Sequence, residues 1–139
     1  MRAIAATALV ALSAAACSPA SQDGAAPRDG GPTSADPAPG FRAIGQEPGW
    51  LAEVARGDAP AIRLLLDYGE RRLTLPRSTA FDEDGNRSFG YRGMADGLAV
   101  ELRIHRETCH DTMSGEAFET RVELRVGEER FDGCGMFLP

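Results

Sequence analysis

The sequence contains no lysine, and all fifteen of its positively charged residues are arginines. Aromatic side chains are also scarce, with six Phe, two Tyr and a single Trp. The 21 acidic residues outnumber the arginines and give a formal net charge of −6. A protein that binds the phosphate backbone of nucleic acids needs a basic surface, so this composition argues against a nucleic acid as the partner.

A hydrophobic run long enough to span a membrane is also missing. Residues 3–16 are uncharged and mostly apolar, but a stretch this short cannot span the ~30 Å hydrocarbon core of a bilayer as a helix. Preceded by Arg2, the run has the length and flanks of the apolar region of a secretory signal. We therefore predict that residues 1–16 are a signal peptide.

The end of this run indicates how the chain is anchored. Three alanines at 14–16 stand directly before Cys17, which resembles the bacterial lipobox, where the signal is cut before a cysteine that then carries lipid. A diacylglyceryl group with an added N-acyl chain binds membranes far better than one acyl chain does. By analogy with lipoprotein sorting, Ser18 indicates the outer membrane, with the protein facing the periplasm. The alternative is a plain secretory signal cut near Ala16.

The cysteine count supports lipidation. Three cysteines in an exported chain leave one unpaired, and a lipid on Cys17 leaves Cys109 and Cys134 as an even pair in an oxidising compartment. A disulfide between them would close a loop of about 26 residues and stabilise the fold by roughly 3.5 kcal/mol. The alternatives are a redox pair or metal ligands, but the spacing is neither C-x-x-C nor a zinc pattern.

Residues 18–40 contain no large apolar side chain and are dominated by Pro, Gly, Ala, Ser and Asp. Such a segment buries too little surface to repay the ordering of its backbone. We predict a disordered tether over 17–40, including the lipidated cysteine, followed by one domain over 41–139. The alternative is that the tether itself is a recognition arm.

Alternation with a period of two begins in this domain and is typical of half-buried strands. The alternating sets are Trp50, Ala52 and Val54; Ile62, Leu64, Leu66 and Tyr68; Leu98, Val100, Leu102 and Ile104; and Thr120, Val122, Leu124 and Val126. Shorter candidate strands are 41–44, 72–75, 88–92 and 130–136, and turn residues separate them. We therefore predict an all-β domain, a small antiparallel β-barrel formed as a meander of about eight strands. A two-sheet sandwich is the alternative.

Three motifs carry a family resemblance. The segment GQEPGW at 45–50 resembles the G-x-E-P-x-W opening of a family of uncharacterised bacterial envelope lipoprotein domains. CHDTMSG at 109–115 is similar to the C-x-D-x-M-S segment of that family, and GCG at 133–135 to its closing G-C. The family is sometimes found beside lysozyme-inhibitor-like or heat-shock-lipoprotein modules. The resemblance implies an envelope location and a fold, without an activity.

Four residues in these motifs are candidates for facing a ligand: Glu47, Trp50, Asp111 and Ser114. Trp50 follows a Pro-Gly bend, and a single Trp in a small β domain is usually a core residue. The sharper hypothesis is that Glu47 and Trp50 together face a ligand. For Asp111 and Ser114 the alternative is that they cap a turn through bonds from side chain to backbone.

No motif in the sequence predicts a metal, a cofactor or catalysis. His105, Cys109, His110 and Asp111 are close together, but a disulfide would remove Cys109 as a ligand. The acidic run at 82–86 lacks the glycine and glutamate positions of an EF-hand loop, so we expect a hairpin loop there. G-x-S-x-G, H-E-x-x-H, P-loop and C-x-x-C motifs are absent, and only a loose pairing of Ser114 with a histidine remains.

The sequence therefore favours a non-catalytic, lipid-anchored binding domain in the bacterial cell envelope. Its partner would be an envelope protein, a cell-wall fragment or a lysozyme. The N-terminal lipid would anchor the protein itself in the membrane. The c-type lysozyme inhibitor form of this hypothesis depends on the family resemblance alone. The alternatives are a structural or stress-tolerance protein of the envelope, or a metal or small-molecule carrier that uses the mouth of the barrel.

Overall fold

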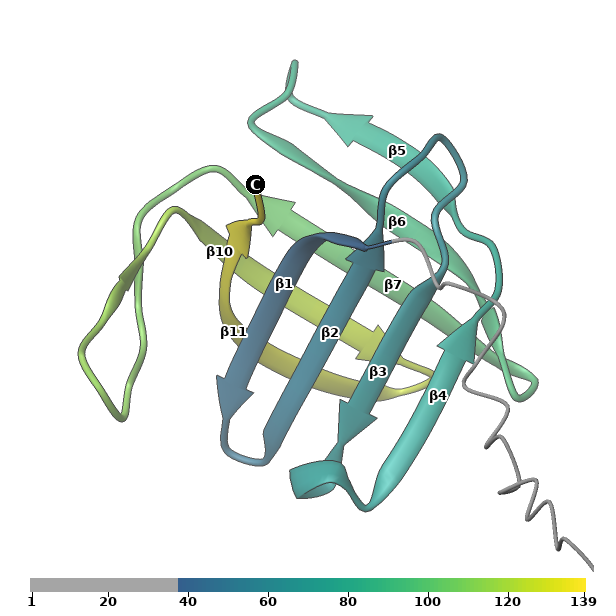
Figure 1. Ribbon diagram of the computed structural model, residues 1–139, viewed down its shortest axis with the longest axis horizontal. Coiled ribbons are helices and arrows are strands. Elements are labelled where there is room, and N and C mark those ends of the chain that lie inside the picture. Colours follow the sequence, from purple (N-terminus) through teal and green to yellow (C-terminus); the bar gives the residue numbers. More distant parts are fainter. Residues whose placement is uncertain (1–37) are drawn as a thin grey trace, which may run out of the picture. The chain divides into compact units, whose positions relative to one another are not determined.

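The computed structural model of this protein describes residues 38–139, which fold into strands joined by short turns (Figure 1). The all-β prediction is confirmed. The predicted signal peptide, Cys17 and all of the predicted tether before residue 38 lie outside the described residues. Strand β1 begins at Pro39, so the sheet starts two residues before the predicted domain boundary.

Eleven strands and one short 3-10 turn make up the described chain. They are β1 (Pro39–Gln46), β2 (Gly49–Ala55), β3 (Ile62–Leu66), η1 (Asp67–Gly69), β4 (Arg71–Leu75), β5 (Thr79–Glu83), β6 (Ser88–Ala95), β7 (Leu98–His105), β8 (Cys109–His110), β9 (Ala117–Phe118), β10 (Thr120–Val126) and β11 (Glu129–Phe137).

Nine of these strands form one antiparallel sheet in the order β4-β3-β2-β1-β11-β10-β7-β6-β5. We call β1 to β4 the first wing and β5, β6, β7, β10 and β11 the second wing; the pairing of β1 with β11 joins them. The sheet curls into a half-barrel, and in Figure 1 the first wing crosses in front of the second. Each wing is a meander, so the predicted antiparallel meander is confirmed, and β4 and β5 form the two edges of the sheet.

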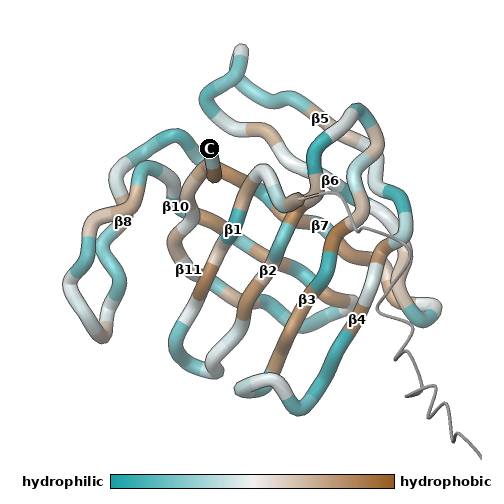
Figure 2. Tube along the Cα trace, in the orientation of Figure 1, coloured by the Kyte–Doolittle hydropathy of each residue, from teal (hydrophilic) through white to brown (hydrophobic). Residues whose placement is uncertain are grey.

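The core lies between the two wings because each strand turns alternate side chains inward. Figure 2 shows this alternation as bands of hydrophobic and hydrophilic residues along the strands. Burying a Val, Leu or Ile side chain contributes about 1.5–3 kcal/mol. The largest fully buried apolar side chains are Val54, Ile62, Leu64, Leu66, Leu75, Val100, Leu102, Ile104, Val122, Leu124 and Val126.

Two local predictions differ from the structure. Tyr68 was predicted as the last inward residue of a strand, but β3 ends at Leu66 and Tyr68 lies in the turn η1 with a φ of +57°. This prediction was wrong because Asp67, Tyr68 and Gly69 all have positive φ and reverse the chain. Strand β5 was not predicted because it is an edge strand with no fully buried residue, so its sequence does not alternate cleanly.

A short hairpin, β8–β9, is attached to the sheet by a disulfide. Cys109 of β8 and Cys134 of β11 are bonded, with their Cα atoms 5.5 Å apart, which confirms the predicted pair. The two-residue strands β8 and β9 were not predicted, since two residues are too few to show a period. Within residues 38–139, no helix has the length and apolarity needed to cross a membrane.

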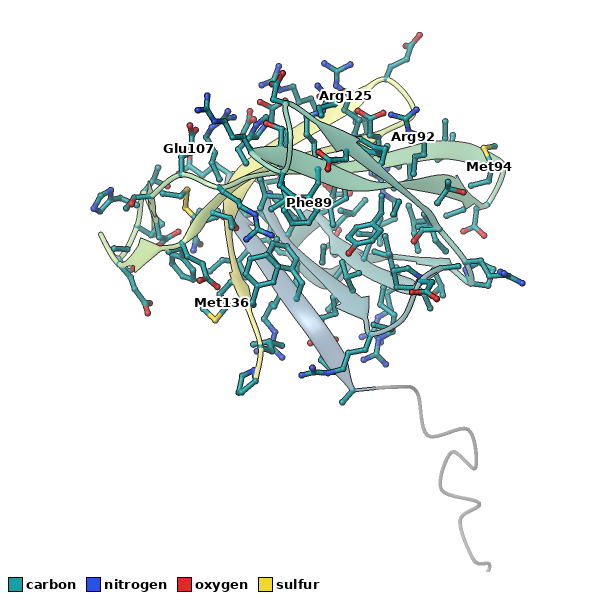
Figure 3. All side chains as sticks on the ribbon, turned by 90° about the horizontal axis from the view of Figure 1, so that it is seen from above. Phe89, Arg92, Met94, Glu107, Arg125 and Met136 are labelled. Atoms are coloured by element: carbon teal, nitrogen blue, oxygen red, sulfur yellow. A yellow bond between two sulfur atoms is a disulfide. The ribbon has the colours of Figure 1, made fainter. Side chains whose placement is uncertain are left out.

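Arginines and acids are numerous on the outer face of each wing, and Figure 3 labels Arg92 and Arg125 of the second wing. In the first wing, Glu53 accepts hydrogen bonds from Arg42 at 2.7 Å and from Arg63 at 3.0 Å. In the second wing, Glu123 accepts one from Arg121 at 2.6 Å. The hydrogen bond from Arg42 is the main cause that lowers the pKa of Glu53, and the bond from Arg121 is the main cause for Glu123.

Candidate functional site

Trp50, a sequence candidate for ligand contact, lies in the core with 5% of its surface exposed. Its Nε1 donates a hydrogen bond to the carbonyl oxygen of Asp132 at 3.1 Å. The indole ring also packs on the ring of Phe131, with 6.4 Å between centroids. Both its ring and its N–H are therefore used to join β2 of the first wing to β11 of the second.

Glu47 lies in the turn between β1 and β2, where it is exposed and precedes the cis bond to Pro48. No hydrogen-bond or ion-pair partner of Glu47 occurs among residues 38–139. The residue before it, Gln46, donates from Nε2 to Asp111 Oδ1 at 3.0 Å. This bond places the β1–β2 turn beside the β8–β9 hairpin.

Asp111 and Ser114 cap the loop of the β8–β9 hairpin. Asp111 Oδ2 accepts hydrogen bonds from the backbone N–H and the Oγ of Ser114, both at 2.8 Å. The bond from the Ser114 backbone N–H is the main cause that lowers the pKa of Asp111. The geometry is that of the turn-capping alternative in the sequence analysis, with Gln46 as an additional donor to the carboxylate.

The motifs thus bring four candidates to one end of the domain but into separate surroundings. Trp50 borders a hollow of about 310 Å³ on the first wing, whereas Asp111 borders one of about 190 Å³ beside the disulfide. Gln46 lines both hollows, so it marks the boundary between them.

The hollow on the first wing contains an apolar row that sequence alternation did not predict. Ile44, Leu51 and Leu65 are consecutive cross-strand partners on β1, β2 and β3, and all three are half-buried. They point outward, because their chain neighbours Ala43, Ala52 and Leu64 are core residues. Charged side chains are usual on the outer face of such a sheet, so three aligned aliphatic residues are informative.

Tyr68 stands over one end of this row with 76% of its surface exposed. Its hydroxyl donates to the carbonyl oxygen of Gln46 at 3.2 Å, and its ring covers Gly49. A Cβ at position 49 would lie 2.6 Å from the ring, so only glycine fits beneath Tyr68. Asp67 and Tyr68 both have positive φ, a conformation that costs a non-glycine residue about 1–3 kcal/mol. We call Ile44, Leu51, Leu65 and Tyr68 the Tyr68 platform.

The histidines do not pair with Ser114. His105 Nδ1 is hydrogen-bonded to Ser88 Oγ at 2.9 Å, across the β6–β7 pair, and His105 Nε2 lies 3.6 Å from Glu123 Oε1. Ser88 was not a candidate from the sequence, because its contact with His105 depends on the register of β6 and β7. Ser88 is buried, and its hydroxyl ties β6 to β7.

The residues considered as metal ligands are dispersed. Cys109 is in the disulfide and Asp111 is in its own loop. Within 38–139, no group of three or more His, Cys, Asp or Glu side chains is placed to hold a metal ion. Of the predicted hairpin loop at 82–86, Asp82 and Glu83 end strand β5, and residues 84–87 connect it to β6. The Asn86 backbone N–H is bonded to Asp82.

Comparisons of the chain with protein-family models, with curated proteins and with solved structures find no match. A function for this protein is therefore inferred from the surfaces of the domain.

Proposed function

We propose that this protein is a non-catalytic binding domain of the bacterial cell envelope, held at the membrane by lipid on Cys17. The observation that carries the proposal is the Tyr68 platform, an outward apolar row beside a highly exposed aromatic ring. Strained backbone persists where the surrounding structure enforces it, and it is enriched at ligand-binding sites. Here the strain displays Tyr68 instead of burying it.

Charge around the platform indicates the chemistry of the partner. Glu47 and Glu70 are exposed, and each follows a residue that lines the hollow, Gln46 and Gly69. One exposed arginine, Arg72, is the cross-strand partner of Leu65, so acidic residues outnumber it around the platform. A protein segment with a large apolar side chain flanked by positive charge would complement this surface. The net charge of −6 would also favour the approach of a cationic partner.

The family resemblance supports the same surface. Position 49, directly before Trp50, is often aromatic in the envelope lipoprotein domains that the motifs resemble. Here Gly49 leaves room for the ring of Tyr68, which supplies an aromatic group at the same place from another loop. A c-type lysozyme is a cationic candidate that the neighbourhood of that family suggests, so it is tested directly.

The experiment compares the full lipoprotein with its Tyr68→Ser variant in crosslinking capture from envelope membranes. Met113→Ser is the matched control, because Met113, at 72%, is nearly as exposed as Tyr68 but lies in the β8–β9 loop. We expect a partner captured by the wild type and by Met113→Ser and lost with Tyr68→Ser.

A second arm adds purified c-type lysozyme and measures whether the protein slows it. Slowing that requires Tyr68 would identify the lysozyme-inhibitor form, and no effect at high excess would exclude that form. A partner set that does not depend on Tyr68, or no partner at all, would contradict the proposal. The structural or stress-tolerance role would then be favoured, which deletion of the gene would test.

A further inference from the structure

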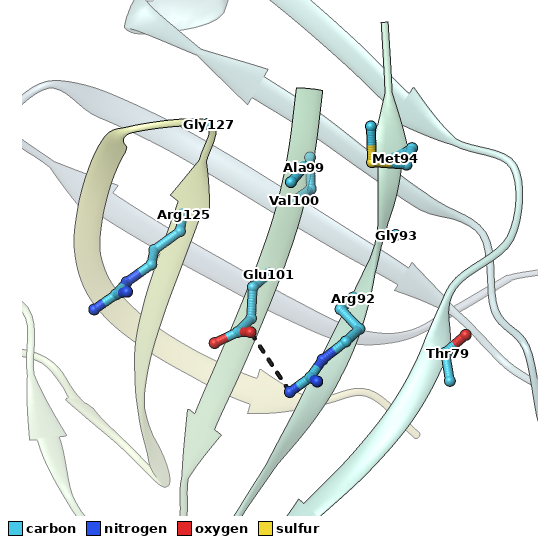
Figure 4. A pocket seen from close by; sticks show the side chains of 9 residues that line it. All are labelled: Thr79, Arg92, Gly93, Met94, Ala99, Val100, Glu101, Arg125 and Gly127. Carbon is cyan, nitrogen blue, oxygen red and sulfur yellow. Dashed lines mark ion pairs between the residues drawn. The ribbon is translucent and has the colours of Figure 1, made fainter. Parts of the chain in front are cut away.

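The second wing has a different hollow on its outer face, a trough of about 530 Å³ across β6, β7 and β10 (Figure 4). Its shape follows from two neighbouring cross-strand rows. In the first row, Met94 lies opposite Ala99, and the carbonyl oxygen of Ala99 accepts a hydrogen bond from the Gly127 backbone N–H. Because alanine and glycine have little or no side chain, they form a depressed floor in the trough. The volume is within the range of small-molecule sites, about 300–1,000 Å³.

The second row carries charge along one side of the trough. Arg92, Glu101 and Arg125 are consecutive cross-strand partners, and Figure 4 shows Glu101 between the strands that carry the two arginines. Arg92 Nη2 lies 3.5 Å from Glu101 Oε2, while the other oxygen of Glu101 accepts from Arg103 at 2.8 Å.

This arrangement leaves an excess of positive charge at the trough. One carboxylate is shared by Arg92 and Arg103, and Arg125 is exposed with no ion-pair partner among residues 38–139. The guanidinium of Arg92 is held in place by the Phe81 ring, 4.2 Å from its centre. Two guanidiniums beside one carboxylate form a local cationic site on a chain of net charge −6, and an anionic group complements it.

The other side of the trough is apolar. Met94, which is 57% exposed, and its cross-strand partner Ala99 line this side. A ligand that fills the trough would therefore meet guanidinium groups on one side and aliphatic side chains on the other. Hydrophobic contact with an exposed methionine accommodates flexible chains well, because the thioether adapts its shape.

We propose that this trough binds a single-chain anionic amphiphile, a fatty carboxylate, with its head at Arg92 and Arg125 and its chain over Ala99 towards Met94. The site is independent of the Tyr68 platform, which lies on the first wing. It gives the domain a small-molecule ligand in addition to any protein partner.

The experiment uses the full lipoprotein in vesicles of uncharged phosphatidylcholine and a decanoate that carries a diazirine on its chain. After irradiation, trypsin cuts after Arg92 and Arg103, so residues 93–103 form one peptide that contains Met94, Leu98 and Ala99. We expect the label on this peptide. Decanoate added before irradiation should displace the probe and reduce the labelling, whereas acetate and uncharged decanol should not.

Variants then test the two sides of the trough. Arg92→Gln with Arg125→Gln should reduce labelling by roughly tenfold or more, because two charge-assisted contacts are lost. Without Arg92 the corresponding tryptic peptide is residues 88–103. Ala99→Leu should block the floor. Arg72→Gln removes one positive charge from an exposed residue of the first wing and is the control for each arginine replaced singly. It should label like the wild type, with the Cys109–Cys134 bond checked in every sample.

Three outcomes would overturn the proposal. Labelling spread over many peptides, or displacement by decanol as effective as by decanoate, would indicate unspecific adsorption of an amphiphile. Labelling unchanged by the arginine variants would exclude the cationic head site. Displacement by vesicles containing phosphatidylglycerol but not by free decanoate would assign the trough to bilayer lipid instead.

Discussion

In the first wing, the outward side chains of three neighbouring strands form the apolar row Ile44–Leu51–Leu65, whereas in the second wing the row Arg92–Glu101–Arg125 is fully charged. Both wings bury the same kinds of aliphatic side chain inward. The core thus requires only that alternate residues be apolar, and it leaves the outer residues free to differ. One half-barrel can therefore present two outer surfaces of different chemistry, one aliphatic and one charged.

The largest expected effect comes from breaking the joint between the wings. Trp50→Ala removes a buried indole that packs on Phe131 and donates to Asp132, so we expect a loss of about 3–5 kcal/mol in unfolding free energy. Urea denaturation followed by circular dichroism measures it. Trp50→Phe, which keeps a ring in the core, should lose less. A loss below about 1 kcal/mol for Trp50→Ala would show that the β1–β11 pairing holds the wings together without the indole.

The next effect concerns the β8–β9 hairpin, whose covalent attachment is to the second wing. Replacing Cys109 and Cys134 with alanine should lower stability by roughly 3.5 kcal/mol, since the loop closed by the bond is about 26 residues long. Reduction of the wild type with dithiothreitol should give a similar denaturation midpoint. Equal midpoints for the oxidised and reduced protein would mean that the hairpin is held by packing and by the Gln46–Asp111 bond.

A smaller effect compares the paired glutamates of the two wings. Glu53→Gln and Glu123→Gln should each cost roughly 1 kcal/mol near neutral pH. Because the folded-state pKa of each glutamate is lowered, its stabilisation is present above the unfolded pKa of about 4.3 and is lost as the pH falls through the folded pKa. Urea denaturation from pH 7 to pH 2 should show each variant approaching the wild type. A constant difference over this range would contradict the ionic origin.

The smallest effect on stability is expected at the Tyr68 platform. Tyr68→Asn places a residue that tolerates positive φ at a strained position, so we expect stability to rise by roughly 0.5 kcal/mol. Partner capture should nevertheless be lost, which separates binding from folding. Thermal denaturation measures the first quantity. A loss of more than about 1 kcal/mol would mean that Tyr68 supports the fold through Gly49 and Gln46.

The long alternating segments of the sequence predicted their strands well. Leu102 and Val122, for example, occupy the core positions that a period of two requires. The cysteine count predicted the disulfide, because the predicted lipid on Cys17 leaves Cys109 and Cys134 as the remaining pair. Asp111 and Ser114 form the predicted alternative of a capped turn, since a local motif contains both the acceptor and the donors.

The candidate surfaces were harder to predict. Tyr68 fits an alternating pattern in the sequence, but three successive residues with positive φ turn it outward. The row of Arg92, Glu101 and Arg125 combines three strands, and no spacing along the chain places these residues together. Ser88 and His105 are likewise adjacent only through strand register.

The sequence by itself determined the long alternating strands, their inward faces and the disulfide partners, because each depends on residues close in the chain or on composition. Only the tertiary structure decided the strand order, the curl of the sheet and the outward rows. Those features depend on which strands pair and in which register, and the inner face constrains register through burial alone. The two surfaces proposed for binding are therefore consequences of the pairing of the strands.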